Sequence, residues 1–450
     1  MAPKRFSGED VDPTPLGEPL PFEFSGKVAP NRFLKAAMSE RLATWDAKDL
    51  PKRGVPTKEL INVYKRWGES GFGVILTGNV MLDYDHLEGA GNTIIPREAP
   101  FSGERFGAFT ELASQAKAHG SLIVAQISHP GRQVSAKIQQ YPISSSDIQL
   151  EGTPMGSTFA KPRPMGKEDI RAVVDSFAHA AEYCYRAGFD GIQLHGAHGY
   201  LIAQFLALST NKRSDEYGGS LSNRARFIFE ILEETRKRVN DKKFIIGIKI
   251  NSVEFQDGGF SPEDCRDLCV QLENGCFDFV ELSGGTYQDL AFQHRRESTR
   301  KREAFFLEFA EMIAPQLKKT KVYVTGGLRT AGAMVNALKS VHGVGLGRPI
   351  CHDFNLPKKI LEGNVKSAIE FKISEDDFVM TSIAAGTQMQ LVGKDKEPLD
   401  LSQDKHLDVF MKSTQLWIQM MSENEDNSKV GYVDVVGMEL ESYGTPYASS

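Results

Sequence analysis

The chain has 450 residues and a formal net charge of −6, and 40% of its residues are hydrophobic, as is typical of a globular protein with a sizeable core. No run of Lys and Arg with interleaved aromatic residues is present, so nucleic acid is not expected as a partner. The longest apolar runs, such as Phe72 to Leu76, are far shorter than the roughly 20 residues that cross a bilayer, which excludes membrane insertion.

Residues 1–25 are polar and rich in proline, which predicts an extended N-terminal lead-in. This stretch has neither the apolar core of a signal peptide nor the Arg-rich pattern of a transit peptide. We therefore expect a cytoplasmic location.

After the lead-in, short β-rich runs alternate with helical patterns. The expected strands are 32–38, 74–77, 122–128, 191–195, 244–251, 279–283, 321–325 and 343–347. The expected helices are 57–70, 104–119, 167–187, 220–239, 261–274, 303–317, 330–340 and 356–369. Cap residues such as Thr57, Ser220, Ser261 and Thr330 support four of the helix starts.

Eight apolar strands, each followed by a crossover helix, predict a parallel sheet that is buried on both faces. We expect a single (β/α)8 TIM barrel over residues 26–370, with an open, doubly wound sheet as the alternative. Cys265, Cys269 and Cys276 fall on one amphipathic helix, where buried thiols explain them better than a metal does, so we expect no metal site.

Residues 371–450 exceed what a barrel requires and form a C-terminal, mostly helical extension in this interpretation. One stripe of this extension repeats at helical spacing: Leu407, Phe410, Met411, Thr414, Trp417, Ile418 and Met421. We expect the stripe to pack on the barrel or on a second copy of the chain, as in a homodimer, rather than to hold a cofactor.

In such barrels the functional groups lie where strands end and loops begin, and a phosphate often binds after the last two strands. Here the seventh strand ends in Thr325-Gly326-Gly327, and the eighth ends in Gly345-Leu346-Gly347-Arg348. Glycines let backbone N–H groups approach a phosphate, and Arg348 can pair with it. A phosphate ligand is therefore favoured over the alternative, which is tight loop geometry alone.

The fifth strand carries Lys249 near its end, inside an otherwise apolar run. A buried cation requires an anion or an electron-rich ring, and the alternative is a plain salt bridge to Glu281 on the next strand. The third strand ends with Gln126, an amide that can donate and accept, and Ser39 follows the first strand.

Two imidazoles and a phenol, His195, His198 and Tyr200, lie within six residues after the fourth strand. One alternative is that the two histidines bind zinc, but the sequence offers no obvious third ligand. Another is that they are a structural pair whose ring nitrogens form hydrogen bonds within the protein. The favoured interpretation is that both rings donate hydrogen bonds to a carbonyl or phenolate oxygen while Tyr200 acts as an acid.

These residues carry a family resemblance. The supporting motifs are Pro30-Asn31-Arg32, Leu76-Thr77-Gly78-Asn79, Gln126-Ile127-Ser128-His129-Pro130-Gly131-Arg132, His195-Gly196-Ala197-His198-Gly199-Tyr200, the run from Ser209 to Arg224, and Gly347-Arg348. Over roughly residues 15 to 365 the chain resembles the Old Yellow Enzyme family of flavin-dependent ene-reductases. The resemblance does not explain the extension.

The resemblance implies noncovalently bound FMN. Ser39 would lie at the O4/N5 edge of the flavin, Gln126 at its pyrimidine edge, and Lys249 would face N1/O2. Ala37 and Met38 would offer backbone contacts, and Asn79 and His195 would also contact the cofactor. The phosphate would be surrounded by Gly285, Gly326, Gly327, Gly347 and Arg348.

The implied reaction is ping-pong. NADPH or NADH reduces the flavin, and N5 then passes hydride to the C=C bond of an enone or enal held by His195 and His198. Tyr200 protonates the other carbon. Two alternatives remain open: an isomerase, dehydrogenase or oxidative enzyme of a secondary-metabolite pathway, and a non-catalytic binder of phenols or steroid-like ligands.

Overall fold

Eight parallel strands close into a barrel in the computed structural model, which describes residues 2–254, 258–284, 307 and 309–447. The barrel closes because β3 pairs with both β13 and β4. The single-barrel prediction is confirmed. The barrel strands are β3 Phe33–Lys35, β4 Val74–Met81, β6 Leu122–Ser128, β9 Gly191–Gly196, β10 Ile245–Val253, β11 Phe279–Gly284, β12 Lys321–Thr325 and β13 Gly343–Leu346.

Helices surround the barrel, and the four expected cap residues all accept a backbone N–H in the first turn. The helices of the barrel region are α2 Lys58–Glu69, α3 Gly103–Lys117, α4 Lys167–Arg186, α5 Leu201–Leu206, α6 Leu221–Arg238, α7 Pro262–Asn274, α9 Ala331–Ala337, α10 Pro349–His352 and α11 Leu356–Leu361. Among the described residues, no helix is long and apolar enough to cross a membrane.

Several expected elements differ from the structure. The expected helix 356–369 is wrong beyond Leu361, because Gly363 takes a left-handed φ of +72° and ends the helical run. Ser367 and Ile369 then form isolated β-bridges instead. The expected first strand, 32–38, is shorter in the structure. Of the expected helix 303–317, residues 303–306 and 308 lie outside the described residues, residues 309–313 are helical, and Ala314–Gln316 form a 3-10 turn.

The lead-in closes the N-terminal end of the barrel and is not simply extended. It forms a short helix, α1 Thr14–Gly17, and an antiparallel pair, β1 Leu20–Pro21 with β2 Val28–Ala29. Phe22 in this hairpin packs on Phe279 of β11, with 5.9 Å between the ring centroids. Asp278 accepts the backbone N–H of Ser25 at 2.8 Å and so ties the hairpin to the barrel. The hairpin therefore covers this end of the barrel, and the cavity described below lies at the opposite end.

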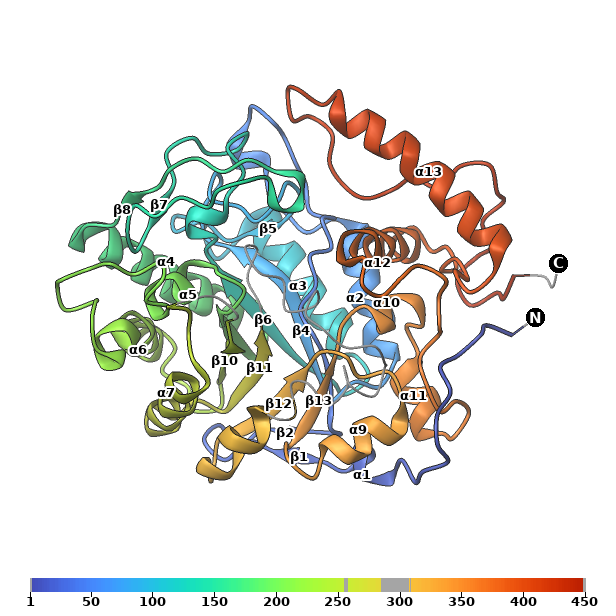
Figure 1. Cartoon of the computed structure of the whole chain (residues 1–450), viewed down its shortest axis with the longest axis horizontal. Helices are drawn as coiled ribbons and strands as arrows, with labels where there is room; N and C mark the ends of the chain where they lie inside the picture. The colour runs from blue at the N-terminus through green and yellow to red at the C-terminus, as the bar shows by residue number, and fades with distance from the viewer. Residues whose placement is uncertain (1, 255–257, 285–306, 308, 448–450) are drawn as a thin grey trace.

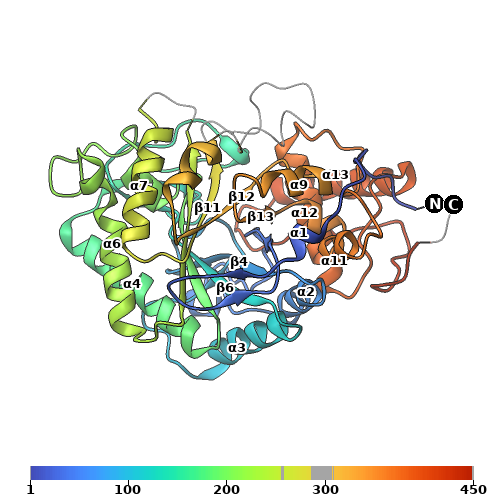
Figure 2. The same cartoon turned by 90° about the horizontal axis from the view of Figure 1, so that it is seen from below.

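The extension packs against the barrel through α12 Phe378–Gly393, which contacts α2 and α10 (Figure 1). A second helix, α13 Asp404–Ser422, lies outside it, and Phe410, Leu391 and Val433 belong to a small core that both helices share. The expected stripe on α13 is buried only in part, because Met411 and Ile418 are exposed. Packing on a second copy stays a prediction. Figure 2 places the two chain ends on the same side of the molecule.

The barrel interior leaves no room for a methyl group at Gly247 of β10, because a Cβ there would lie 2.3 Å from the Phe279 ring. Such overpacking typically costs about 1–3 kcal/mol. We therefore expect Gly247→Ala to lower the free energy of unfolding by that amount in urea titrations. Gly107→Ala is the matched control, because Gly107 is exposed on α3 with nothing within 4 Å, and it should be neutral or stabilising. Equal effects of the two changes would contradict this account.

Candidate active site

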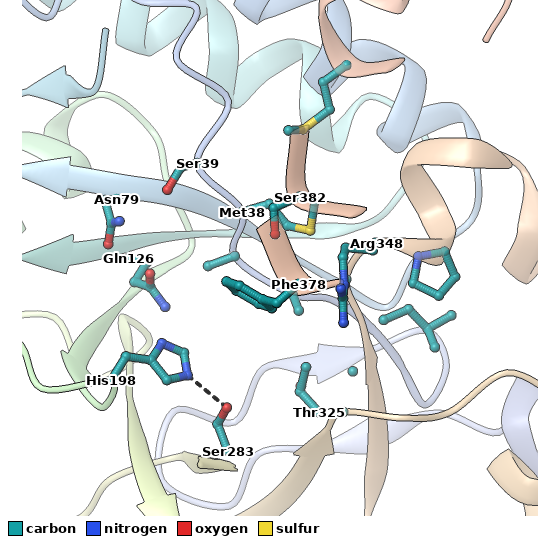
Figure 3. Close-up of a pocket in the computed structure, with 18 of the residues that line it drawn as sticks. Met38, Ser39, Asn79, Gln126, His198, Ser283, Thr325, Arg348, Phe378 and Ser382 are labelled. Atoms are coloured by element: carbon teal, nitrogen blue, oxygen red, sulfur yellow. Dashed lines mark hydrogen bonds between the residues drawn. The ribbon is translucent and has the colours of Figure 1, made fainter. Parts of the chain in front are cut away.

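A cavity of about 510 Å³ opens at the carboxyl ends of the barrel strands (Figure 3). Every strand, or the loop directly after it, contributes to the wall: Ala36, Asn79, Gln126, His195, Lys249, Ser283, Thr325 and Gly345. Of the expected site residues, those that line this cavity are Ala37, Met38, Ser39, Asn79, Gln126, His195, His198, Tyr200, Lys249, Gly326, Gly327, Gly347 and Arg348. Gly285 lies outside the described residues.

A chain of buried polar groups forms the floor of the cavity. Lys249 Nζ lies 3.1 Å from Glu281 Oε1, and the two side chains are 5% and 0% exposed. Gln193 Nε2 donates to Glu281 Oε2 at 2.8 Å, and Gln126 Nε2 donates to Gln193 Oε1 at 2.7 Å. The salt-bridge alternative for Lys249 is therefore correct, and the same ammonium group also borders the cavity.

The loop after β9 presents His195, His198 and Tyr200 to the cavity. His198 has a left-handed φ of +58°, a strained conformation for a residue with a Cβ. Its backbone N–H donates to Asn251 at 3.1 Å, its carbonyl accepts from Gln133 at 3.0 Å, and its Nε2 lies 3.0 Å from Ser283 Oγ. These three contacts hold the strained loop in place.

Both histidines are neutral near pH 7. Burial, with the nearby Lys249 charge as a further cause, holds the pKa of each ring well below its ordinary value of 6.5. Ala197 N–H donates to His195 Nδ1 at 3.3 Å, so the proton of that neutral ring belongs on Nε2. Tyr200 packs edge-on against His195, with the ring centroids 4.6 Å apart. In the described part of the chain, no third ligand joins the two rings in a cluster suited to a metal ion.

The other end of the cavity is built from glycines and arginines. Gly326 and Gly327 have φ values of +138° and +76°, and a Cβ on Gly345 would overlap Thr325 Oγ1. Arg348 at this end donates to Thr381 of α12, and its guanidinium lies 5.4 Å from the centre of the Phe378 ring. The glycines and Arg348 that were expected at a phosphate therefore lie together on the cavity wall, and the extension also contacts Arg348. Phosphate binding here stays a prediction.

The sequence-based expectation missed the extension as part of the cavity wall. Its lining residues are Phe378, Val379, Ser382, Ile383, Met389, Trp417, Ile418 and Tyr432. Phe378 and Ser382 point from α12 into the cavity in Figure 3. The helical stripe on α13 already contained Trp417 and Ile418, but periodicity alone does not say what a stripe faces. Arg41, Glu88 and Arg329 also line the cavity and were not expected.

Comparison with known proteins decides the family. The model of the NADH:flavin oxidoreductase / NADH oxidase family matches residues 19–367. The chain belongs to this family. It is a flavin oxidoreductase that uses FMN with a reduced nicotinamide nucleotide, and the resemblance to the Old Yellow Enzyme family is confirmed.

Among curated relatives, "NADH-dependent flavin oxidoreductase nadA" of Aspergillus parasiticus is 47% identical over 92% of this chain and 93% of its own length. "NADH-dependent flavin oxidoreductase iliE" of Hypocrea jecorina is 33% identical over 75% of this chain and 86% of its own length. The match to the Aspergillus parasiticus protein covers 92% of this chain, so it includes part of the C-terminal extension as well as the barrel. The solved Old Yellow Enzyme homologue of Zymomonas mobilis has the same fold, with a TM-score of 0.65 and 23% identity over 82% of this chain and 96% of that one.

The cavity fits FMN by its own chemistry. Two buried polar atoms on its wall, Asn79 Oδ1 and Thr325 Oγ1, have no hydrogen-bond partner in the described part of the chain. Buried polar atoms of this kind are normally satisfied, so a polar ligand is expected beside them. Lys249 and Arg348 place positive charge at both ends of a wall whose middle is made of small and apolar residues such as Ala37. This pattern suits an anionic phosphate joined to a flat ring.

The buried histidines should make the fold sensitive to acid. A histidine whose pKa is depressed in the folded state stays neutral there, whereas the unfolded chain takes up a proton below about pH 6.5. We expect the free energy of unfolding to fall as the pH drops from 7.5 to 5, measured by urea titration. His129, whose pKa burial also holds well below 6.5, contributes to this fall, so His129→Gln should flatten the profile.

His119→Gln is the control for this experiment, because His119 is exposed and its replacement should leave the slope unchanged. A pH profile that is flat in the parent protein would contradict the neutral, buried state of these rings.

Proposed function

We propose that the protein reduces the C=C bond of α,β-unsaturated carbonyl compounds with NADH as the electron donor. The observation that carries this proposal is the grouping of His195, His198 and Tyr200 on one wall of the cavity that also contains Lys249 and Arg348. Two hydrogen-bond donors beside a phenol suit an oxygen that gains negative charge while a neighbouring carbon needs a proton.

In this mechanism the carbonyl oxygen of the substrate binds between His195 and His198. A neutral imidazole that donates a hydrogen bond polarises the carbonyl without giving up its proton, and this draws electron density away from the C=C bond. FMN, when bound, supplies the hydride. Tyr200 then delivers a proton to the carbon next to the carbonyl, which makes the product saturated. Without an acid at this position, the charge on that carbon would favour return of the hydride over net reduction.

The residues that we propose for the cofactor follow the shape of the cavity. Lys249 and Gln126 would contact the polar edge of the ring, with Asn79 and Ser39 beside it. The phosphate would bind at Gly326, Gly327, Gly347 and Arg348. NADH is our proposed donor because the relatives that are 47% and 33% identical are both named NADH-dependent.

Tyr200→Phe separates the two halves of the reaction. We expect the variant to bind FMN and to be reduced by NADH at the parental rate, because the phenol acts only in the proton step. Reduction of 2-cyclohexenone should slow by 10²-fold or more, roughly the usual contribution of a positioned acid. Stopped-flow absorbance of the flavin measures both rates under anaerobic conditions. An equal loss in both half-reactions would refute the proton-donor role.

We further propose that the body of the substrate is bulky and apolar. The extension lines the cavity with Val379, Ile383 and Ile418, and two of these are large apolar side chains left open to solvent: Val379 is 45% and Ile418 is 50% exposed. Apolar surface of this kind at a cavity mouth gains free energy when a ligand covers it.

Ile418→Ala tests this substrate class against a matched control on the same helix. Leu416 is 56% exposed on α13 and does not line the cavity. For a fused-ring enone such as a steroid 4-en-3-one, Ile418→Ala should raise KM about fivefold, roughly 1 kcal/mol of lost apolar contact. Leu416→Ala should leave KM unchanged, and neither variant should affect 2-cyclohexenone. Equal behaviour of the two variants would refute the apolar wall.

A further inference from the structure

Tyr432 reaches from the extension into the loop that carries Ser39. Its hydroxyl donates to the backbone carbonyl of Ser39 at 2.9 Å, across 393 positions of sequence. Burial raises the pKa of Tyr432 to about 12, so the phenol keeps its proton and remains a donor near neutral pH. Tyr432 and Ser39 both line the cavity.

Helix α12 fixes the position of Tyr432. The backbone N–H of Tyr432 donates to Gln390 Oε1 at 3.0 Å, and Gln390 Nε2 donates to Asp434 Oδ1 at 2.8 Å. The Tyr432 ring lies over Gly386, where a Cβ would come within 2.3 Å of it. The close approach of the ring to the helix therefore requires glycine at this position.

The loop segment that Tyr432 contacts is held by several elements at once. Arg41 has a left-handed φ of +55°, and its guanidinium lies 5.4 Å from the centre of the Tyr432 ring. Glu40 accepts the backbone N–H of Gly78 at 2.9 Å and also binds the hydroxyl of Tyr64. A strained backbone persists only when its surroundings determine it, and Tyr432 supplies two contacts to this segment from outside the barrel.

We infer that Tyr432 is a positioning residue of the active site, which sets the conformation of residues 39–41 and through them the binding of FMN. The inference rests on the proposed place of Ser39 beside the flavin. It assigns to the C-terminal extension a part in cofactor binding, in addition to its part in the cavity wall.

Tyr432→Phe removes only the hydroxyl and tests the inference. We expect FMN to bind roughly two- to tenfold more weakly, as for one net hydrogen bond, measured by flavin fluorescence during titration of the apoprotein. The reduction potential of the bound flavin should shift as well, measured by dye equilibration. Gly386→Ala should reproduce both changes, because it displaces the Tyr432 ring while leaving the hydroxyl intact.

Tyr447→Phe is the matched control. The Tyr447 hydroxyl also donates to a backbone carbonyl, that of Glu397, at 3.1 Å, but both partners belong to the extension. If Tyr432 merely stabilises the extension, the two Phe variants should lower the melting temperature alike and leave FMN affinity and potential unchanged, which would overturn the inference. Neither readout involves an enone, so failure of the proposed reduction would be seen separately, as FMN-loaded parent protein that does not turn over 2-cyclohexenone.

Discussion

The buried ion pair of Lys249 and Glu281 is the interaction on which the cavity floor depends. Removing two charges from water is costly, and a buried pair is tolerated when its attraction is supported by further hydrogen bonds. Glu281 takes its second contact from Gln193, which in turn accepts from Gln126. Four side chains on four neighbouring strands are thereby fixed relative to one another. The buried charge of Lys249 thus helps to fix the side chains that lie at the base of the cavity.

The charge of Lys249 also lowers the pKa of both His195 and His198. In the barrel register Lys249 lies opposite His195 on β9, and its charge disfavours a proton on either ring. Burial acts in the same direction and is the larger cause. The proposed reaction needs hydrogen-bond donors that keep their protons, and this arrangement suits it because the imidazoles stay neutral while Tyr200 lies beside them. In that proposal the donor and acid functions belong to different side chains.

The barrel could be predicted because its signals are local. Apolar runs bounded by capped helices specify parallel strands, and the strand ends then identify residues such as Lys249 and Gln126. The error at residues 362–369 has a local cause too, since Gly363 ends the helix where apolar spacing suggested that it continues. The contribution of Tyr432 to the cavity was not predictable in this way. Its contact depends on how α12 packs on the barrel, and no pattern within residues 371–450 encodes that packing.

Three of the extension's contacts join it to residues of the cavity wall. Tyr432 binds the Ser39 carbonyl, Thr381 binds Arg348, and Glu375 lies 2.7 Å from Arg329 in an ion pair. Each contact joins the extension to a residue that lines the cavity, and two of these residues are the arginines at the proposed phosphate end. The barrel strands by themselves do not supply the contacts that Tyr432, Thr381 and Glu375 make with this wall. The cavity is therefore complete only when the extension has folded against the barrel, and this makes the site a property of the whole chain.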